Sequence, residues 1–334
     1  MRQPEVARLL PLLLALVLVT PVALAAQRWL LAGAFLTEFI SGGRLSVLTG
    51  LTAEPRRQAL RGAVLTDRYA ARQVRTPVPL VLVHGFASAG KDDRRAGHAA
   101  RLLARAGFDV LVPSLPGLMQ GRLRPSDAEP VVTAIEAARD ARSVSVIAVS
   151  IGAGPALLAA ADPRVRHRVA MVVTVGGYAS AHELLRFFLT GDFAWGDVRG
   201  HVDHDPEIVR LFVAANADLV DEPTRRAIED GDRARIAAFL AAPPADLRRL
   251  LEALSPVHVA ADVPARLLLI HGRGDRAVPY TESLRLAAAR RGPTTVALLG
   301  TLGHVEGADE GVRRWGVQDF LTLWLGLYAL ASAT

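Results

Sequence analysis

Short apolar runs and amphipathic stretches alternate along most of the chain. The continuous apolar runs, typical of strands buried on both faces, lie at 79–84, 108–112, 145–149, 169–175, 266–271 and 295–299. Helical spacing or small-residue content marks 96–106, 131–138, 152–161, 283–290 and 311–330. Residues 62–70 add a further strand or hairpin. The alternation predicts an α/β fold with a mostly parallel, doubly wound sheet.

One segment, 178–262, does not alternate. It contains no convincing strand pattern and is predicted to form several helices. It holds 15 acidic residues and 9 arginines, which gives it a net charge of −6. Since the whole chain carries +6, the remaining residues together carry +12. We expect this segment to be a helical lid inserted into a core, whose two halves are residues 44–177 and 263–334.

Residues 1–43 form a separate N-terminal region. Positions 9–26 contain no charge over 18 residues, which is the lower limit for crossing a bilayer. The run is either an uncleaved membrane helix or a secretory signal, for which Ala23-Leu24-Ala25 offers a cleavage site. A buried core helix is a third interpretation. Apolar residues from 29 to 40 recur at helical spacing and predict an amphipathic helix, and we expect a location at the cell envelope.

Composition narrows the class of protein. The chain has 334 residues, 51% of them hydrophobic, and no Cys, which excludes disulfides, thiol catalysis and Cys-based zinc sites. Lys91 is the only lysine among 39 basic residues, and the excess of Arg and Ala is typical of a GC-rich bacterial genome. With 5% aromatic residues and no basic run interleaved with them, we expect no nucleic-acid site.

Three residues with catalytic chemistry each follow a predicted strand. Ser150 lies in Ala148-Val149-Ser150-Ile151-Gly152, between a strand and a small-residue helix, as in a nucleophile elbow. Asp275 follows the strand at 266–271, and His304 follows the strand at 295–299. Because the carboxyl ends of parallel strands share one edge of a sheet, we expect these side chains to lie together. A Ser beside a His base that a carboxylate orients is the arrangement of serine hydrolases.

The first strand of this series ends in His84-Gly85-Phe86-Ala87-Ser88. Gly85 permits a close approach of the backbone to a ligand. The amides of Phe86 and Ile151 are therefore predicted to form an oxyanion hole. We expect His84 to orient this loop rather than to react.

Together these features resemble the α/β-hydrolase-fold family over residues 62–330. The part from Ser255-Pro256 through Val278-Pro279 is similar to the dienelactone-hydrolase and acyl-peptidase-like branch. The resemblance implies a serine hydrolase with Ser150 as nucleophile, His304 as base and Asp275 as the acid. The chain departs from the family pattern at Ala148, where Gly is usual.

The predicted lid holds half of the ten Phe residues and Trp195. We expect Phe188 and Trp195 to line an acyl pocket; the alternative is that the aromatic side chains form the lid's own core. The ligand-type residues of His201-Val202-Asp203-His204-Asp205 are predicted to form a solvated loop, with no metal and no cofactor.

The sequence thus predicts a carboxylesterase- or lipase-like serine hydrolase of a small-molecule ester or related acyl substrate. A non-catalytic binding protein of the same fold and an acyltransferase are the alternatives.

Overall fold

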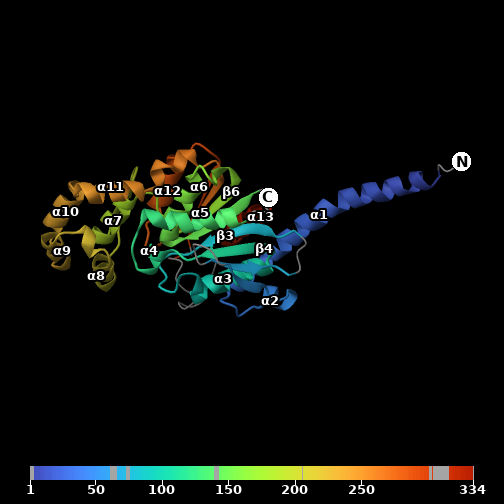
Figure 1. The fold of residues 1–334 in the computed structure, drawn as a ribbon, viewed down its shortest axis with the longest axis horizontal. Helices are drawn as coiled ribbons and strands as arrows, with labels where there is room; N and C mark the ends of the chain where they lie inside the picture. The colour runs from blue at the N-terminus through green and yellow to red at the C-terminus, as the bar shows by residue number, and fades with distance from the viewer. Residues whose placement is uncertain are drawn as a thin grey trace.

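A central eight-stranded sheet organises the chain (Figure 1). The structure, a computed structural model, describes residues 4–60, 66–72, 76–138, 143–204, 206–300, 303 and 316–333. The strands lie in the order β1-β2-β4-β3-β5-β6-β9-β10. Their bounds are β1 Arg56–Leu60, β2 Thr66–Ala70, β3 Val78–Val83, β4 Phe108–Pro113, β5 Val144–Val149, β6 Val169–Val175, β9 Arg266–Gly272 and β10 Thr294–Leu299. Strands β1 and β2 pair antiparallel and β2 pairs antiparallel with β4, whereas all other pairs are parallel, so the predicted α/β class is confirmed.

Both faces of the sheet are buried, which explains the continuous apolar runs. In β3, Val81 and Val83 join one core cluster while Leu80 and Leu82 join the other. The first cluster includes side chains of α5 (Ala128–Ala137), α6 (Ala153–Ala161) and α12 (Thr281–Ala288). The second includes side chains of α3 (Arg94–Arg105) and α13 (Val317–Ala331). Because successive side chains of a strand point to opposite faces, a strand between two helix layers must be apolar at every position.

The amphipathic stretch predicted at 29–40 is the C-terminal part of α1 (Pro4–Ile40), and it packs onto the second helix layer. The ring of Trp29 stacks on Trp324 of α13 at a centroid distance of 4.9 Å, and Trp324 Nε1 donates to the Trp29 carbonyl oxygen. Buried Glu38 accepts hydrogen bonds from Thr49 of α2 (Val47–Leu51). This part of α1 is therefore a component of the core: α13 and α3 cover the side that carries Ala32, Phe35 and Leu36, whereas Leu30 and Phe39 are exposed.

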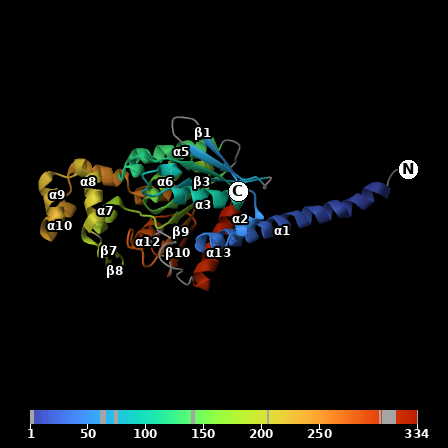
Figure 2. The same ribbon diagram turned by 90° about the horizontal axis from the view of Figure 1, so that it is seen from below.

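The remainder of α1 extends away from the body, at the end opposite to the lid (Figures 1 and 2). Within the described part of the chain, no helix combines the length and the apolar character that crossing a bilayer requires. The N-terminal membrane segment stays a prediction.

The segment predicted to be the lid lies between β6 and β9. Its helices are α7 Ala181–Thr190, α8 Pro206–Ala215, α9 Glu222–Glu229, α10 Arg233–Ala241 and α11 Ala245–Ala253. Its two ends are joined: Tyr178 Oη donates to the Leu254 carbonyl oxygen and the Ala181 amide donates to Ser255 Oγ.

The prediction of a purely helical lid is wrong. Strands β7 (Asp192–Trp195) and β8 (Val198–His201) form an antiparallel hairpin. Its two-residue turn is Gly196-Asp197, with Gly196 at a φ of 56°. A Gly-Asp turn between two short runs is a hairpin signal that the helical interpretation overlooked. The hairpin packs against α12, where Arg285 donates to the Ala194 carbonyl oxygen.

The α1–α13 contact gives a test of the core role of α1. A Cβ on Gly33 would lie 2.5 Å from the Trp324 ring, which cannot move away because Trp29 and Phe320 hold it. Gly33→Ala should therefore destabilise the folded chain by about 1–3 kcal/mol despite the better helix propensity of Ala. Chemical denaturation measures the change, with Gly50→Ala in α2, where nothing lies within 4 Å, as the control. Equal stability of the two variants would show that α1 does not pack on α13.

Candidate active site

Ser150 lies at the sharp turn between β5 and α6. Its φ of 54° makes it the only non-glycine residue with a positive φ in the described part of the chain. A left-handed conformation costs an L-residue roughly 1–2 kcal/mol, and such strain persists only where the surroundings impose it. The short 3-10 turn Ser150–Gly152 leads directly into α6, so that the positive end of that helix lies beside the serine. This is the geometry expected of a nucleophile elbow.

Two glycines allow the end of β3 to approach this turn. A Cβ on Gly152 would lie 2.2 Å from the His84 carbonyl oxygen, and one on Gly85 would lie 3.1 Å from Ser150 Cβ. Ala148, by contrast, is a fully buried position in β5 opposite Val83. The strict requirement for glycine is thus on the helix side of the serine, and a methyl group is accommodated on the strand side.

His84 fixes the loop after β3, as predicted. Its side chain is buried, with Nδ1 donating to the Gly85 carbonyl oxygen at 2.8 Å and Nε2 accepting from the Leu115 amide at 3.3 Å. Because an amide can only donate to Nε2, the proton lies on Nδ1. Burial lowers the pKa of His84, against the hydrogen bond to Gly85, so the ring is neutral at pH 7. Phe86 follows, at the exposed tip of the loop.

The single lysine helps to hold the same loop. Lys91 Nζ lies 3.0 Å from Asp92 Oδ2 and 3.3 Å from Oδ1 of buried Asp67 in β2. Arg57 of β1 contacts both carboxylates. A compact ammonium fits between two carboxylates that an Arg already bridges, which gives a physical reason for Lys at this position.

Asp275 lies on the loop between β9 and α12, at the same edge of the sheet as Ser150. Its buried carboxylate accepts hydrogen bonds through Oδ1 from the Ala277 and Val278 amides, at 2.9 and 3.0 Å. His271 Nε2 lies 3.5 Å from Oδ2 and donates to the Val278 carbonyl oxygen. The carboxylate is therefore fixed by its own loop. His304 lies outside the described residues, so its place beside Asp275 and Ser150 stays a prediction.

Sequence reasoning missed two buried acids that shape this edge. Asp127 accepts from the Gly117 and Leu118 amides and so caps α4 (Pro116–Met119), and burial raises its pKa. Glu282 of α12 accepts from the Ala179 and Ser180 amides at the root of the lid, and burial raises its pKa too. Acidic residues at helix starts are common on surfaces, so nothing in the sequence marks these two as buried.

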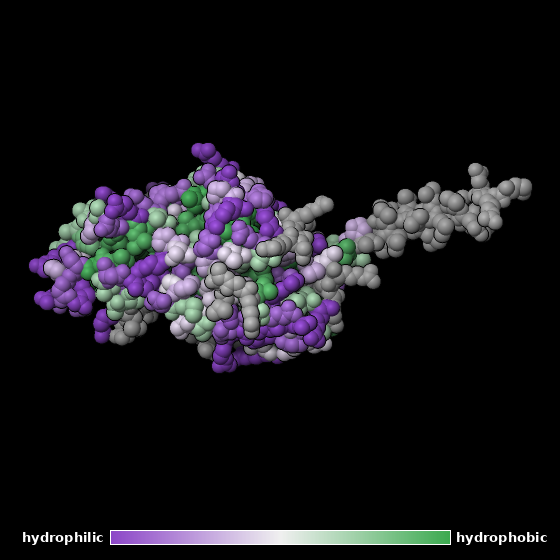
Figure 3. Space-filling model, viewed as in Figure 1, coloured by the Kyte–Doolittle hydropathy of each residue, from purple (hydrophilic) through white to green (hydrophobic). Residues whose placement is uncertain are grey.

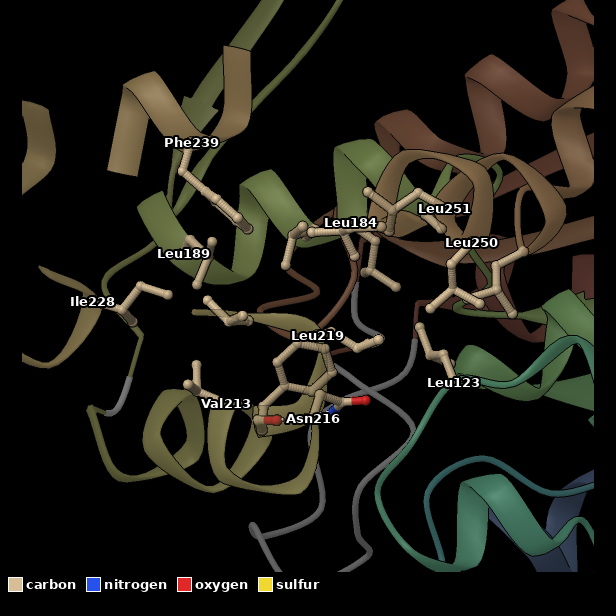
Figure 4. Close-up of a pocket in the computed structure, with 16 residues that line it drawn as sticks. Leu123, Leu184, Leu189, Val213, Asn216, Leu219, Ile228, Phe239, Leu250 and Leu251 are labelled. Carbon is tan, nitrogen blue, oxygen red and sulfur yellow. Dashed lines mark hydrogen bonds between the residues drawn. The ribbon is translucent and has the colours of Figure 1, made fainter. Parts of the chain in front are cut away.

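The lid encloses an apolar cavity of about 50 Å³ (Figure 4). Side chains of α7, α8, α9, α10 and α11 line it, among them Leu184, Phe212, Ile228, Phe239 and Leu251. Leu123 closes one side from the core, and of the described residues that line the cavity only Asn216 has a polar side chain.

A short core segment connects this cavity to the loop after β3. Leu115, whose amide donates to His84, is followed by α4 and then by Leu123 in the cavity wall. Next to Leu123, Arg122 and Arg124 form ion pairs with Asp218 of the lid, and Asn216 Nδ2 donates to the Gly121 carbonyl oxygen. The opposite charges of lid and core thus meet at this contact.

The two predicted pocket residues lie in different places. Phe188 of α7 is buried and its ring stacks on Phe212 at 4.9 Å. Trp195 lies on the hairpin, where the Arg285 guanidinium covers its ring at 4.5 Å. Phe188 therefore contacts a residue of the cavity wall, whereas Trp195 contacts α12. The role of both residues in substrate binding stays a prediction.

His201 also has carboxylate partners. Its Nδ1 lies 2.7 Å from Asp192 Oδ1 and its Nε2 lies 3.1 Å from Asp203 Oδ1, and the hydrogen bond to Asp192 raises its pKa. In the described ranges no group of three His, Asp or Glu side chains could hold a metal ion. Asp205 lies outside those ranges.

Comparisons with known proteins agree with this architecture. The family model described as alpha/beta hydrolase fold matches residues 78–304. No curated protein sequence matches the chain. Among solved structures, Pyrococcus horikoshii acylaminoacyl peptidase has a TM-score of 0.54 at 14% identity, covering 84% of this chain and 42% of the peptidase. A puromycin-hydrolyzing peptidase of Mycobacterium tuberculosis has a TM-score of 0.51 at 18% identity, covering 83% and 39%.

Mouse alpha/beta hydrolase domain-containing protein 10 has a TM-score of 0.51 at 14% identity, covering 83% of this chain and 98% of the mouse protein. The chain spans only about two fifths of the length of the two peptidases. At these identities the likeness concerns the fold. Since the family model covers about two thirds of the sequence and the sheet carries a strand–turn–helix elbow at its carboxyl edge, the chain belongs to the α/β-hydrolase-fold family.

Proposed function

We propose that the protein is a serine hydrolase that cleaves carboxylic esters through an acyl-enzyme intermediate. The observation that carries the proposal is the left-handed conformation of Ser150 at the start of α6, with Gly85 directly against it. A strained serine that the fold imposes at a helix N-terminus has no evident structural purpose. The buried, doubly hydrogen-bonded carboxylate of Asp275 at the same sheet edge supports a catalytic use.

In the proposed reaction, Ser150 Oγ attacks the ester carbonyl carbon while His304 removes the hydroxyl proton. Asp275 orients the imidazole and stabilises its charged form. The amides of Phe86 and Ile151 donate to the oxyanion as it develops. His304 then protonates the leaving alcohol, and a water molecule, deprotonated by the same imidazole, releases the acid and restores Ser150.

The substrate's acyl group is proposed to be apolar. The support is the lid cavity, which is lined almost exclusively by apolar side chains; Leu123 of its wall lies eight residues after Leu115, whose amide donates to His84. An apolar group entering such a cavity gains hydrophobic free energy, whereas a charged group would lose its hydration without a partner.

The N-terminal region is proposed to hold the enzyme at the cell envelope. The support is the 18-residue uncharged run at 9–26, on a helix that leaves the body away from the lid. Insertion of this run into a bilayer places the hydrolase domain at the membrane surface.

Removal of the nucleophile tests the catalytic proposal. Ser150→Ala should abolish labelling by a fluorophosphonate probe and lower hydrolysis of p-nitrophenyl butyrate by more than roughly a thousandfold. Asp275→Asn and His304→Ala should each cost nearly as much, because the three groups act as a unit. A thermal unfolding curve like that of the parent protein serves as the control. Persistent labelling of another serine would contradict the assignment.

Filling the cavity tests the acyl site. Leu250→Phe adds volume to the cavity wall at a partly exposed position, so the fold should tolerate it. We expect the kcat/KM ratio of butyrate to acetate p-nitrophenyl esters to fall about tenfold, since one or two methylene groups are worth that much in an apolar pocket. Phe188→Ala and Trp195→Ala are the comparison variants. A larger change of chain-length preference in Trp195→Ala would place the acyl site at the hairpin instead of the lid cavity.

Cell fractionation tests the envelope location. The full chain expressed in bacteria should sediment with membranes and be released by detergent but not by high salt, because an apolar segment rather than charge holds it. N-terminal sequencing of the recovered protein decides between anchor and signal. A freely soluble mature chain that begins near Ala26 would establish a cleaved signal.

A further inference from the structure

Most of the strongly exposed large apolar side chains lie on three helices, α1, α2 and α13, and on the link between the first two. Eleven large apolar side chains are exposed among those that the structure describes. Ten of them belong to α1, to the segment from α1 through α2, or to α13, and the eleventh is Phe86. In Figure 3 hydrophobic colour appears at the base of α1. We call the outward side of these three elements the α1–α2–α13 surface.

The outer face of α13 shows the pattern most clearly. Val317, Leu321 and Leu325 are spaced four residues apart, so they form one stripe, and Val317 is 77% exposed. The only charged residue in the 15 residues of α13 is Asp319, which accepts from the Gly300 amide. A helix that borders water normally carries charged residues on its outer face, and this one carries none.

The neighbouring elements continue the surface. Leu30 of α1 is 68% exposed, and Val22 and Leu24 lie further out on the same helix. On the other side of α1, Val47 and Leu51 of α2 are exposed one helical turn apart. Glu38 joins α2 to α1, and the Trp29–Trp324 contact joins α1 to α13, so the three elements are in direct contact.

We infer that the α1–α2–α13 surface docks against a lipid bilayer with anionic headgroups. Three observations favour a bilayer over a protein partner. The surface is continuous with the 18 uncharged residues 9–26, which lie in α1 itself. The chain outside residues 178–262 carries +12, which complements anionic lipid. Helix α1 also leaves the body at the end opposite to the lid, so that docking leaves the lid in the aqueous phase (Figure 2).

The inference deepens the proposed envelope location and does not depend on the proposed catalysis. It differs from simple anchoring by residues 9–26, because it requires contact between the folded domain and lipid. The domain is then held in one orientation and the lid faces the aqueous phase.

Site-specific labelling of the full chain tests the docking. Because the chain has no Cys, Leu321→Cys can carry a single nitrobenzoxadiazole label, and Ala234→Cys on α10 provides the matched control at the lid. The probe membrane is a vesicle of phosphatidylcholine and phosphatidylglycerol in equal parts, with a nitroxide quencher on the acyl chains. We expect vesicles to shift the emission at position 321 to the blue and to quench it, while position 234 remains unchanged.

The outcomes separate the possible explanations. Equal, water-like emission at both positions in the vesicle-bound chain would overturn docking while leaving the N-terminal attachment in place. A chain that does not bind vesicles at all would overturn both. Self-quenching at position 321 without lipid would show that a second copy covers the surface, and would also overturn the inference.

A charge-insertion pair gives an independent measurement. On a chain labelled at Val317→Cys, Leu321→Glu with Leu325→Glu should lower quenching by the acyl-chain nitroxide at least about twofold, since it places two carboxylates in the lipid-facing stripe while residues 9–26 keep the chain on the vesicle. Ala234→Glu with Ala238→Glu adds the same charge at the same spacing on exposed positions of α10 and should have little effect. Hydrolysis of water-soluble esters should be unchanged in both, which keeps this test separate from the proposed catalysis. Equal quenching in the two variants would contradict docking.

Discussion

The close approach of β3 to the turn after β5 is the constraint on which the candidate site depends. The His84 carbonyl oxygen occupies the space where a side chain at position 152 would begin, and Gly85 lies against Ser150. Packing of this closeness leaves the serine backbone in a left-handed conformation that a free chain would avoid. Parallel pairing of Val83 with Ala148 holds the two strands in register, so the strain is maintained by the sheet itself. The buried His84 ring, the cap from Asp127 to α4 and the Lys91 ion pairs fix the surrounding loops.

Most of the fold could be predicted because burial on both faces of the sheet leaves a strong pattern. Each of the six core strands appeared as an apolar run, and their ends differ from the structure by one residue or less. The α1–α13 contact could not be predicted, because nearly 300 residues separate Trp29 from Trp324 and helical spacing shows an apolar face without its partner. The hairpin β7–β8 was missed because two four-residue strands between helices carry little periodicity.

The residues of the candidate site also fall into two groups, those that could be predicted from the sequence and those that could not. Ser150 and Asp275 were identifiable because each follows a strand in a recognisable local context, and local context decides the backbone there. Asp127, His271 and Glu282 became visible only in three dimensions, since their roles are hydrogen bonds to amides or carbonyls brought close by the fold. The aromatic residues of the lid show the limit of composition: Phe212 and Phe239 line the cavity, whereas Trp195 lies under Arg285. An excess of aromatic side chains indicates an apolar surface but not which one.

Charge, like exposed apolar surface, differs between the lid and the part of the molecule that carries α1. The lid segment carries −6 and the remainder of the chain +12, and the lid lies at the end of the molecule away from α1. Near an anionic surface such a molecule is attracted by its body and repelled at its lid, which favours the orientation that the α1–α2–α13 surface would select by burial. Screening limits the electrostatic effect to about 8 Å at physiological salt, so charge can orient the approaching domain while apolar contact must hold it. The ion pairs of Arg122 and Arg124 with Asp218 act over a few ångströms within the molecule, so an anionic surface beyond the screening distance leaves this contact between lid and core unchanged.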